Sequence, residues 1–445
     1  MSTVDTGTAE SGAKKPGRVR TIVGGGIGNL VEFYDYGVYG LMATPIAMNF
    51  FPSEDPTAGL LATFTVFAAS FAVRPLGGIF FGRWGDKVGR RKALAGAVIL
   101  MGVSTLLIGV FPTYHSVGVL APILLVLARL GQAFSAGGEY GGSAVFLVEH
   151  APKKHKGFFG SIVQFSAMLG VALGSATGAI IANTVSPDMM NEWGWRVPFI
   201  VGGLLGAIGL YVRSKLEESP EYEAIPEDVK AETKPLKLAV TSYWKQTLTL
   251  VGLVVAYTIT VYIVMTYMTT FLTVTVGHTL GEALTVTTIA LIVYIICVPL
   301  AGALSDRIGR KTMMVAFCIL MTVLAWPIFA LIAAGAIWQA ILGDIILVIV
   351  LSLMGGVAQT VYVELFPTEV RNTAVGLGYN VSNAIFGGTT PFVLTALVAA
   401  TGSQMVPAYY LIAACIVTLI VVIGIRETAP LVVARRKAKL SAETT

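Results

Sequence analysis

The sequence predicts an all-α polytopic membrane protein with twelve transmembrane helices in two pseudo-symmetric six-helix bundles. The first reason is composition: 55% of the 445 residues are hydrophobic, 12% are charged, and the mean hydropathy is +0.77. A soluble fold of this length cannot bury so much apolar surface, so lipid must surround the chain. Twelve apolar stretches and an internal repeat complete the prediction.

Twelve stretches are long enough to cross a bilayer, which takes about 20 apolar residues per helix. They lie at Ile22–Met48, Gly59–Phe81, Leu94–Phe111, Val119–Val148, Phe158–Thr184, Val197–Val212, Leu248–Thr273, Leu284–Leu304, Met313–Ala334, Ile337–Val361, Ala374–Ala400 and Val406–Ile425. One long polar segment separates the sixth from the seventh. We therefore divide the chain into a disordered tail (1–20), a first bundle (21–213), a linker (214–246), a second bundle (247–427) and a second tail (428–445).

Lys and Arg residues lie almost entirely on one side of these spans. With the amino terminus inside, 27 of the 30 lie in tails, loops and linker on the cytoplasmic side, and only Arg196 lies on the other. Arg74 and Arg129 lie within spans. Because cytoplasmic segments carry the excess of basic residues, we expect both termini in the cytoplasm and a multi-pass protein of the inner (plasma) membrane.

The two halves repeat each other. Gly82–Lys92 (GRWGDKVGRRK) follows span two, and Gly302–Lys311 (GALSDRIGRK) follows span eight, 220 residues later. A second pair, Val148–Pro152 (VEHAP) and Val363–Pro367 (VELFP), is 215 residues apart. Two matches in the same order at nearly one offset indicate a duplicated six-span unit, and such proteins bind their solute between the halves.

Other classes of protein are disfavoured. The three cysteines lie in apolar runs, and neither they nor the four histidines have the spacing of metal ligands. Gly24–Gly28 follows no strand and lacks the Lys-Ser/Thr of a nucleotide loop. The net charge of +5 reflects topology, so we expect no nucleic-acid partner. We also expect no enzymatic activity, cofactor or metal, and a functional monomer; a membrane-embedded enzyme or receptor is the remote alternative.

The repeated loop resembles the signature of the major facilitator superfamily, and four further stretches resemble its metabolite:proton symporter branch. These are Gly28–Asp35 (GNLVEFYD), Val73–Gly78 (VRPLGG), Gln132–Tyr140 (QAFSAGGEY) and Glu192–Phe199 (EWGWRVPF). The likeness runs from about residue 20 to residue 428. It implies a secondary active transporter that takes up a small carboxylate-bearing solute together with a proton, by alternating access.

The substrate stays open within that branch. Spans four to six and Val406–Leu411 are similar to proline/betaine carriers, which favours a proline- or glycine betaine-like osmolyte. Asn383–Gly388 is more similar to carriers of organic acids. An α-ketoglutarate, citrate or shikimate:proton symporter is therefore the alternative, and sodium in place of the proton is a further one.

Three carboxylates within spans are the predicted proton carriers. Glu32 and Asp35 lie three residues apart in span one, so a helix places them on one face, where they would titrate as a coupled pair. Glu139 lies among four glycines in span four. A carboxylate at membrane depth costs at least about 2.5 kcal/mol unless it is paired, protonated or wet. The alternatives are a fixed ion pair with Arg74 and, for Glu139, a hydrogen bond to another helix.

Basic and aromatic residues of the same region are the predicted solute ligands. The fork of Arg74 can hold a carboxylate by two bonds, or it can pair structurally with Asp35. Arg129 in span four is a second candidate of the same kind. Aromatic faces suit a quaternary ammonium. The aromatic and polar candidates are Tyr34, Tyr36 and Gln164.

The repeated loop places four charged residues at matching positions: Asp86, Arg90, Asp306 and Arg310. We predict a cytoplasmic gate in which an Asp pairs with basic residues or a helix N-terminus in one conformation and releases them in another. The alternative is that the basic residues only set the topology.

Two further features concern single helices. Gly170, Gly174 and Gly178 form a row on one face of span five, which predicts a surface for close helix packing. Asp344 in span ten lies near the external end, and we expect its carboxylate to be wet.

Overall fold

The computed structural model describes residues 18–88, 90–137, 140–149, 151–152, 154–214, 241–368 and 370–443, and their regular structure is helical. Short π-helical segments are labelled η. The half that ends at residue 214 contains α1 (Arg18–Leu41), α2 (Ala43–Phe50), α3 (Pro56–Phe71), α4 (Arg74–Val88), α5 (Arg90–Val110), α6 (Tyr114–Val117), α7 (Leu120–Ala136), α8 (Tyr140–Glu149), α9 (Lys156–Thr184), α10 (Pro187–Met189), η1 (Met190–Gly194) and α11 (Arg196–Ser214).

The half that begins at residue 241 is equally helical. It contains α15 (Trp244–Tyr262), η2 (Ile263–Tyr267), α16 (Met268–Thr270), η3 (Phe271–Val276), α17 (Leu280–Ile308), α18 (Arg310–Ile332), α19 (Ile337–Gly355), α20 (Ala358–Glu364), α21 (Arg371–Ser382), η4 (Asn383–Gly387), α22 (Thr390–Thr401), α23 (Val406–Gly424) and α24 (Pro430–Glu443). The predicted tail after residue 428 thus forms a helix. The first predicted tail and the linker fall mostly outside the described residues.

Each of the twelve predicted spans lies mainly in helical structure, as far as its residues are described. Among the described residues, eight helices are long and apolar enough to cross a membrane. A ninth span consists of Pro187–Gly194 and Arg196–Tyr211, bent by 41°, and two shorter apolar helices cover Ala95–Val110 and Leu120–Ala136. The charged residues of span one, the bend before α11 and the short length of the helices at Ala95–Val110 and Leu120–Ala136 explain why length and composition alone find fewer than twelve.

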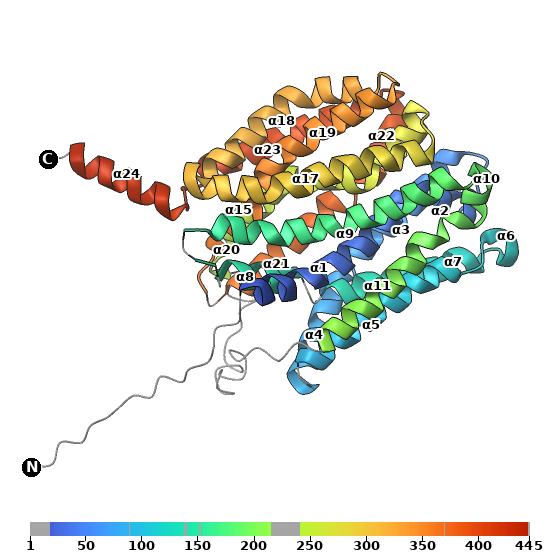
Figure 1. Cartoon of the computed structure of the whole chain (residues 1–445), viewed down its shortest axis with the longest axis horizontal. Helices are drawn as coiled ribbons and strands as arrows, with labels where there is room; N and C mark the ends of the chain where they lie inside the picture. Colours follow the sequence, from blue (N-terminus) through green and yellow to red (C-terminus); the bar gives the residue numbers. More distant parts are fainter. Residues whose placement is uncertain are drawn as a thin grey trace, which may run out of the picture.

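The helices lie side by side, and the two halves pack along one another (Figure 1). Within the first half, α1 packs on α9 and α11, and α5 packs on α7 and α11. Within the second, α18 packs on α19 and α23. Between the halves, α9 lies along α17, and α3 packs against α22. Buried aromatic and aliphatic side chains from both halves join in one core.

A break in span two positions one charged residue. The helix stops after Phe71, and α4 starts at Arg74, just before Pro75, whose ring lacks the N–H of a continuous helix. A Cβ at Gly137 would lie 1.9 Å from the carbonyl oxygen of Arg74, and one at Gly77 would lie 1.7 Å from that of Phe134. Only glycine allows this backbone contact, so the break in span two is held against the end of α7.

Close packing also occurs along the glycine row of α9. A Cβ at Gly170 would lie 2.0 Å from the carbonyl oxygen of Leu30, and one at Gly174 would lie 2.7 Å from Val38. At Gly178 the nearest atoms belong to Met42 and, from the other half, Leu284. The row therefore faces α1 and the boundary with α17.

Candidate functional site

Four charged side chains are buried at membrane depth in the first half. Glu32 is 0% exposed, Asp35 1%, Arg74 4% and Arg129 1%. They come from α1, α4 and α7; glycine contacts at Arg74 join α4 to α7, and the pair of Arg74 with Glu32 joins α4 to α1. Because an isolated buried charge is costly, the partners of each one decide what the cluster can do.

Arg74 and Glu32 form an ion pair. Nη2 of Arg74 lies 3.2 Å from Oε1 of Glu32, and Nε donates a hydrogen bond of 2.9 Å to the hydroxyl of Tyr36. The guanidinium lies 4.2 Å from the ring centre of Tyr36 and 4.9 Å from that of Phe71. The carboxylate partner of Arg74 is thus Glu32 and not Asp35. This pair is neutral overall and is enclosed by aromatic rings.

Asp35 has a different partner. Its Oδ2 accepts a hydrogen bond of 2.7 Å from the hydroxyl of Thr105 on α5, and its Oδ1 has no hydrogen-bond partner among the described residues. Glu32 and Asp35 share a helix face as predicted, but they contact different helices. The two carboxylates therefore belong to separate parts of the site.

Arg129 is the second buried cation, and no carboxylate in the described part of the chain pairs with it. Its Nη1 donates a hydrogen bond of 2.7 Å to Oε1 of Gln132, while Nε and Nη2 have no partner there. The guanidinium lies 4.1 Å from the ring centre of Tyr39 and 5.2 Å from that of Phe67. Two of its three nitrogens are thus available to a carboxylate that enters the site.

The second half faces this cluster with an aromatic ring. Tyr262 at the end of α15 packs edge-on against Phe67 and Phe71, at centroid distances of 6.0 and 5.7 Å. The π-helical segment η2 follows it, and π-helical turns often mark functional sites. Thr258 donates a hydrogen bond to Asn383 of a second π-helical segment, η4. Sequence reasoning missed Tyr262, because tyrosine in an apolar helix is a common packing residue.

The remaining predicted site residues have mixed positions. The hydroxyl of Tyr34 donates a hydrogen bond of 2.9 Å to the carbonyl oxygen of Pro198. It therefore joins α1 to α11 and does not contact the cluster. Gln164 is buried on α9. Glu139 lies outside the described residues. Asp344 is 0% exposed, so the prediction that it is wet is wrong: α19 turns it into the protein, where neither oxygen has a described hydrogen-bond partner.

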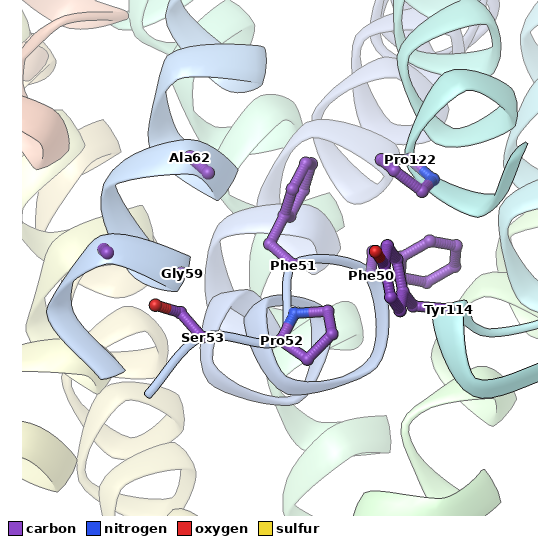
Figure 2. Close-up of a pocket in the computed structure, with 9 residues that line it drawn as sticks. Phe50, Phe51, Pro52, Ser53, Gly59, Ala62, Tyr114 and Pro122 are labelled. Atoms are coloured by element: carbon purple, nitrogen blue, oxygen red, sulfur yellow. The ribbon is translucent and has the colours of Figure 1, made fainter. Parts of the chain in front are cut away.

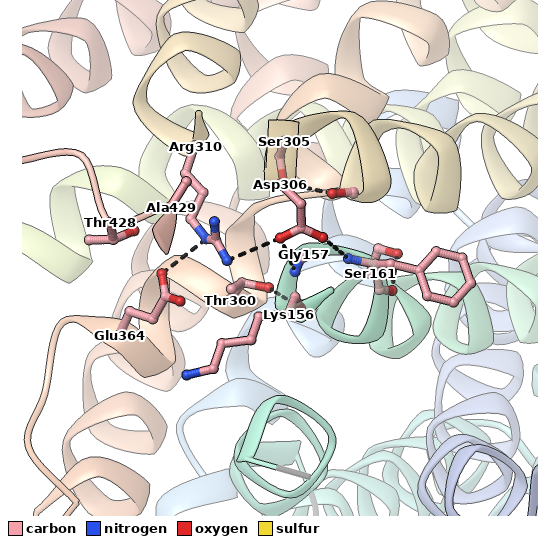
Figure 3. Close-up of polar contacts among 12 residues, drawn as sticks. Lys156, Gly157, Ser161, Ser305, Asp306, Arg310, Thr360, Glu364, Thr428 and Ala429 are labelled. Atoms are coloured by element: carbon pink, nitrogen blue, oxygen red, sulfur yellow. Dashed lines mark hydrogen bonds and ion pairs between the residues drawn. The ribbon is translucent and has the colours of Figure 1, made fainter. Parts of the chain in front are cut away.

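A second group of charges lies where α9 begins and α17 ends; Figure 3 shows its contacts. The carboxylate of Asp306 accepts hydrogen bonds from the backbone N–H groups of Gly157 and Phe158, at 2.9 and 3.2 Å. Arg310 contacts Asp306 at 3.4 Å and Glu364 at 3.0 Å. Since Gly157 and Asp306 belong to different halves, these contacts join the halves.

We call this junction the latch. It consists of Asp306, Arg310, Glu364 and the first turn of α9, with the pair Glu149–Arg371. Two more contacts support it. Thr360 donates 3.0 Å to the carbonyl oxygen of Lys156, and Arg371 forms an ion pair with Glu149. The side chains of Asp86 and Arg90 are outside the described part, although their backbones lie in α4 and α5. The glutamates of the repeated Val-Glu pairs were not predicted to take part; their duplication was the available signal.

The opposite end is also closed between α9 and α17. Asn183 donates a hydrogen bond of 3.2 Å to the carbonyl oxygen of Gly281, and Thr288 donates one of 2.8 Å to the hydroxyl of Ser175. A shallow apolar hollow of about 290 Å³ lies beyond α2 and α3, lined by Phe51, Tyr114 and neighbours (Figure 2). None of its lining residues belongs to the charged cluster. The cluster is therefore enclosed between two closed ends.

Comparisons with known proteins agree with this architecture. A model of the Major Facilitator Superfamily matches residues 25–387 and 250–443. The chain is 35% identical over 422 residues to the proline/betaine transporter of Escherichia coli strain K12, covering 92% of this chain and 84% of that protein. It is 36% identical over 423 residues to the glycine betaine/proline/ectoine/pipecolic acid transporter of Dickeya dadantii, covering 93% and 84%.

Solved structures match the fold. The inward-open xylose transporter of E. coli aligns with a TM-score of 0.69 at 18% identity, covering 93% of this chain and 97% of that chain. The proton:xylose symporter bound to 6-bromo-6-deoxy-D-glucose aligns with a TM-score of 0.73 at 16% identity, covering 92% and 96%. With two helical halves around a buried charged cluster, the chain belongs to the Major Facilitator Superfamily, in its metabolite:proton symporter branch, and is a membrane transporter.

Proposed function

We propose that this protein takes up a zwitterion of the proline or glycine betaine kind together with a proton. It acts as a monomer in the plasma membrane, with both termini in the cytoplasm. The relatives named as proline/betaine and glycine betaine transporters support the substrate class. The excess of Lys and Arg on one side of the spans supports the orientation.

The observation that carries the proposal is the state of Arg129. This buried guanidinium has two nitrogens without a described partner, and a carboxylate would satisfy both in a bidentate pair. The rings of Tyr36 and Phe67 lie next to it, and Tyr262 packs against Phe67; these rings offer faces for the cationic end of a zwitterion. A solute with one carboxylate and one onium group therefore matches the chemistry on both sides.

An organic acid with several carboxylates is a poorer match. Of the two described cations in the cluster, Arg74 is already neutralised by Glu32, so Arg129 remains for the solute. A second or third carboxylate would be buried without a counter-charge, which is costly in a low-dielectric site. Citrate and α-ketoglutarate are the second candidates because of the organic-acid-like segment Asn383–Gly388.

Alternating access would proceed by opening one closed end at a time. The latch closes the cytoplasmic end, and the contacts of Asn183 and Ser175 with α17 close the external end. A proton moving down 100 mV supplies about 2.3 kcal/mol, sufficient for roughly fifty-fold accumulation of a solute. The carboxylate of Asp35 is the best-placed proton carrier, because its neighbours leave one oxygen without a described partner.

Uptake into proteoliposomes tests this function. Labelled glycine betaine should accumulate under an inside-alkaline pH gradient, in potassium as well as in sodium buffer, and excess proline should compete more strongly than citrate, α-ketoglutarate or shikimate. Uptake that ignores both the pH gradient and the membrane potential would refute proton coupling. Competition by the organic acids alone would refute the zwitterion.

A further inference from the structure

Four side chains connect Arg129 to Asp35 through an unbroken series of hydrogen bonds. Arg129 Nη1 donates to Gln132 Oε1 at 2.7 Å, Gln132 Nε2 donates to Thr105 Oγ1 at 2.7 Å, and Thr105 Oγ1 donates to Asp35 Oδ2 at 2.7 Å. Gln132 and Thr105 are fully enclosed, on α7 and α5. A buried cation and a buried carboxylate are thus bridged by two neutral side chains.

The direction of this series is set by Arg129. A guanidinium can only donate, so the amide oxygen of Gln132 must face it and the amide NH₂ must face Thr105. Thr105 Oγ1 therefore accepts from Gln132 and has one proton left to donate. Every bond points from the cation toward the carboxylate.

That single proton has two possible acceptors. Thr105 Oγ1 lies 2.7 Å from Asp35 Oδ2 and 3.0 Å from the carbonyl oxygen of Met101. When Asp35 is ionised, it needs a donor, and the hydroxyl points to it. When Asp35 is protonated, its own O–H can donate to Thr105, whose proton then turns to Met101. Rotation of one hydroxyl thus separates the two protonation states.

Protonation of Asp35 also changes the charge around Arg129. Among the described side chains, Glu32, Asp35, Arg74 and Arg129 sum to zero when all four are ionised. Neutralising Asp35 leaves one positive charge in excess, and Arg129 carries the nitrogens without a partner. In a low-dielectric site, a solute carboxylate then pairs locally with Arg129 while the onium group of the same solute lies on the aromatic rings, so proton and solute favour each other's binding.

Other charged and titratable groups around Asp35 do not replace this connection. Glu32 and Tyr36 on α1 bond to Arg74 of α4, and Tyr262 and Tyr267 of the second half bring no charge. From α11, Gly202 faces Oδ1 of Asp35, and α9 contributes glycines to its contact with α1. Within the described residues, Thr105 and Gln132 provide the bonded path between the carboxylate and the unpaired cation.

We propose that Thr105 and Gln132 are positioning residues that couple protonation of Asp35 to capture of the solute carboxylate by Arg129. This inference rests on the proposed proton-coupled uptake. Thr105 turns its proton between Asp35 and Met101 while it keeps accepting from Gln132, and Gln132 holds the fork of Arg129 in the orientation that meets the solute. Neither residue touches the solute.

The test compares solute affinity at two pH values in the purified, reconstituted protein, with glycine betaine as the probe. Affinity in the unaltered protein should rise about tenfold from pH ~8 to pH ~6, a coupling of about 1.4 kcal/mol. Thr105→Val has the same shape without the hydroxyl, and the ratio should fall toward one. Thr105→Ser keeps the hydroxyl and should keep the tenfold affinity ratio. Gln132→Leu should give the same loss as Thr105→Val.

Thr322→Val is the matched control, because Thr322 makes the same bond to the carbonyl four residues earlier, at 2.7 Å to Cys318, in the other half. It should keep the tenfold ratio. If Thr105→Val and Gln132→Leu also keep that ratio, the positioning role of Thr105 and Gln132 is overturned, while proton-coupled uptake stands. If the unaltered protein binds glycine betaine equally well at both pH values, both the positioning role of the two residues and the coupling of proton and solute binding are overturned.

Discussion

The two halves of this transporter contribute different kinds of polar group to the surroundings of the charged cluster. The first half encloses two carboxylates and two guanidinium groups, Glu32, Asp35, Arg74 and Arg129. The second half faces them with neutral groups such as Tyr262, Thr258 and Asn383. A neutral surface can slide over a charged one without breaking ion pairs, so charge compensation stays within one half during movement.

At the latch the division is reversed. The second half supplies the charges of Asp306, Arg310 and Glu364, whereas the first half presents mainly the backbone N–H groups at the start of α9. A carboxylate on a helix N-terminus is stabilised by the unpaired N–H groups and the helix dipole. The difference indicates that chemistry and closure are assigned to opposite halves.

The largest expected effect is that of Arg129→Gln, which removes the unpaired cation of the charged half. Affinity for glycine betaine should fall by about 30-fold or more, since losing one partner of a buried charge pair costs about 2–5 kcal/mol. Equilibrium binding to the purified protein measures it. Arg196→Gln is the control, because Arg196 donates to the carbonyls of Gly109 and Phe111 at the helix ends and lies over the ring of Trp195. Unchanged affinity in Arg129→Gln would contradict the proposed site.

Asp306→Asn tests the closing role of the second half. Without the charge, the bond to the first turn of α9 should weaken by about 1–2 kcal/mol, which raises the open population about five- to thirty-fold. The rate at which a thiol reagent modifies Ser161→Cys, a buried position beside the latch, reports this opening.

The control for the latch is Glu282→Gln at the other end of α17. Glu282 also caps a helix N-terminus, where it accepts a hydrogen bond of 2.9 Å from the N–H of Thr279. Both residues belong to the second half, so this bond does not join the two halves. With Ser161→Cys as the reporter, the thiol should be modified at the same rate whether or not Glu282→Gln is also present. Equal rates in Asp306→Asn and Glu282→Gln would show that the latch does not hold the halves together.

A smaller effect is expected for Tyr262→Leu, which removes the ring that the second half offers. Affinity for glycine betaine should fall about two- to fivefold, because an aromatic contact to a cation contributes about 0.5–1 kcal/mol. Tyr262→Phe keeps the ring and should keep the affinity, as measured by competition binding. An equal loss in both variants would assign the hydroxyl, and not the ring face, to the solute.

The smallest effect is expected for Asp344→Asn. Asp344 is a buried carboxyl of the second half whose oxygens have no described hydrogen-bond partner, so it gains little from a charge. Uptake and its pH dependence should stay within about twofold, and thermal stability should not fall. A loss of pH-driven uptake would move part of the proton chemistry into the second half.

The sequence predicted the fold well because its signals are additive over short segments. Twelve apolar stretches, the basic residues between them and the duplicated loop all follow from local composition and lead to the observed helices and family. It also singled out Glu32, Asp35, Arg74 and Arg129, because an ionised residue in an apolar span is costly unless it serves a purpose. It did not identify Thr105 or Gln132, since such residues are frequent in membrane helices without a functional role.

Position within a span was less informative about surroundings. Asp344 lies near the expected external end, yet the helix turns it inward, and Tyr34 lies beside Asp35, yet its hydroxyl serves α11. A helix rotates by about 100° per residue, so neighbours in sequence face different helices unless packing is known.

The sequence by itself determined that this chain spans a membrane, in which order its spans follow, and which of them carry charge, because transfer of each side chain into lipid depends on that side chain alone. Only the tertiary structure decided the partners: Glu32 meets Arg74 at a separation of 42 residues, and Asp35 meets Thr105 at 70. Those pairings depend on helix rotation and on glycine contacts between helices, which no local property of the chain encodes.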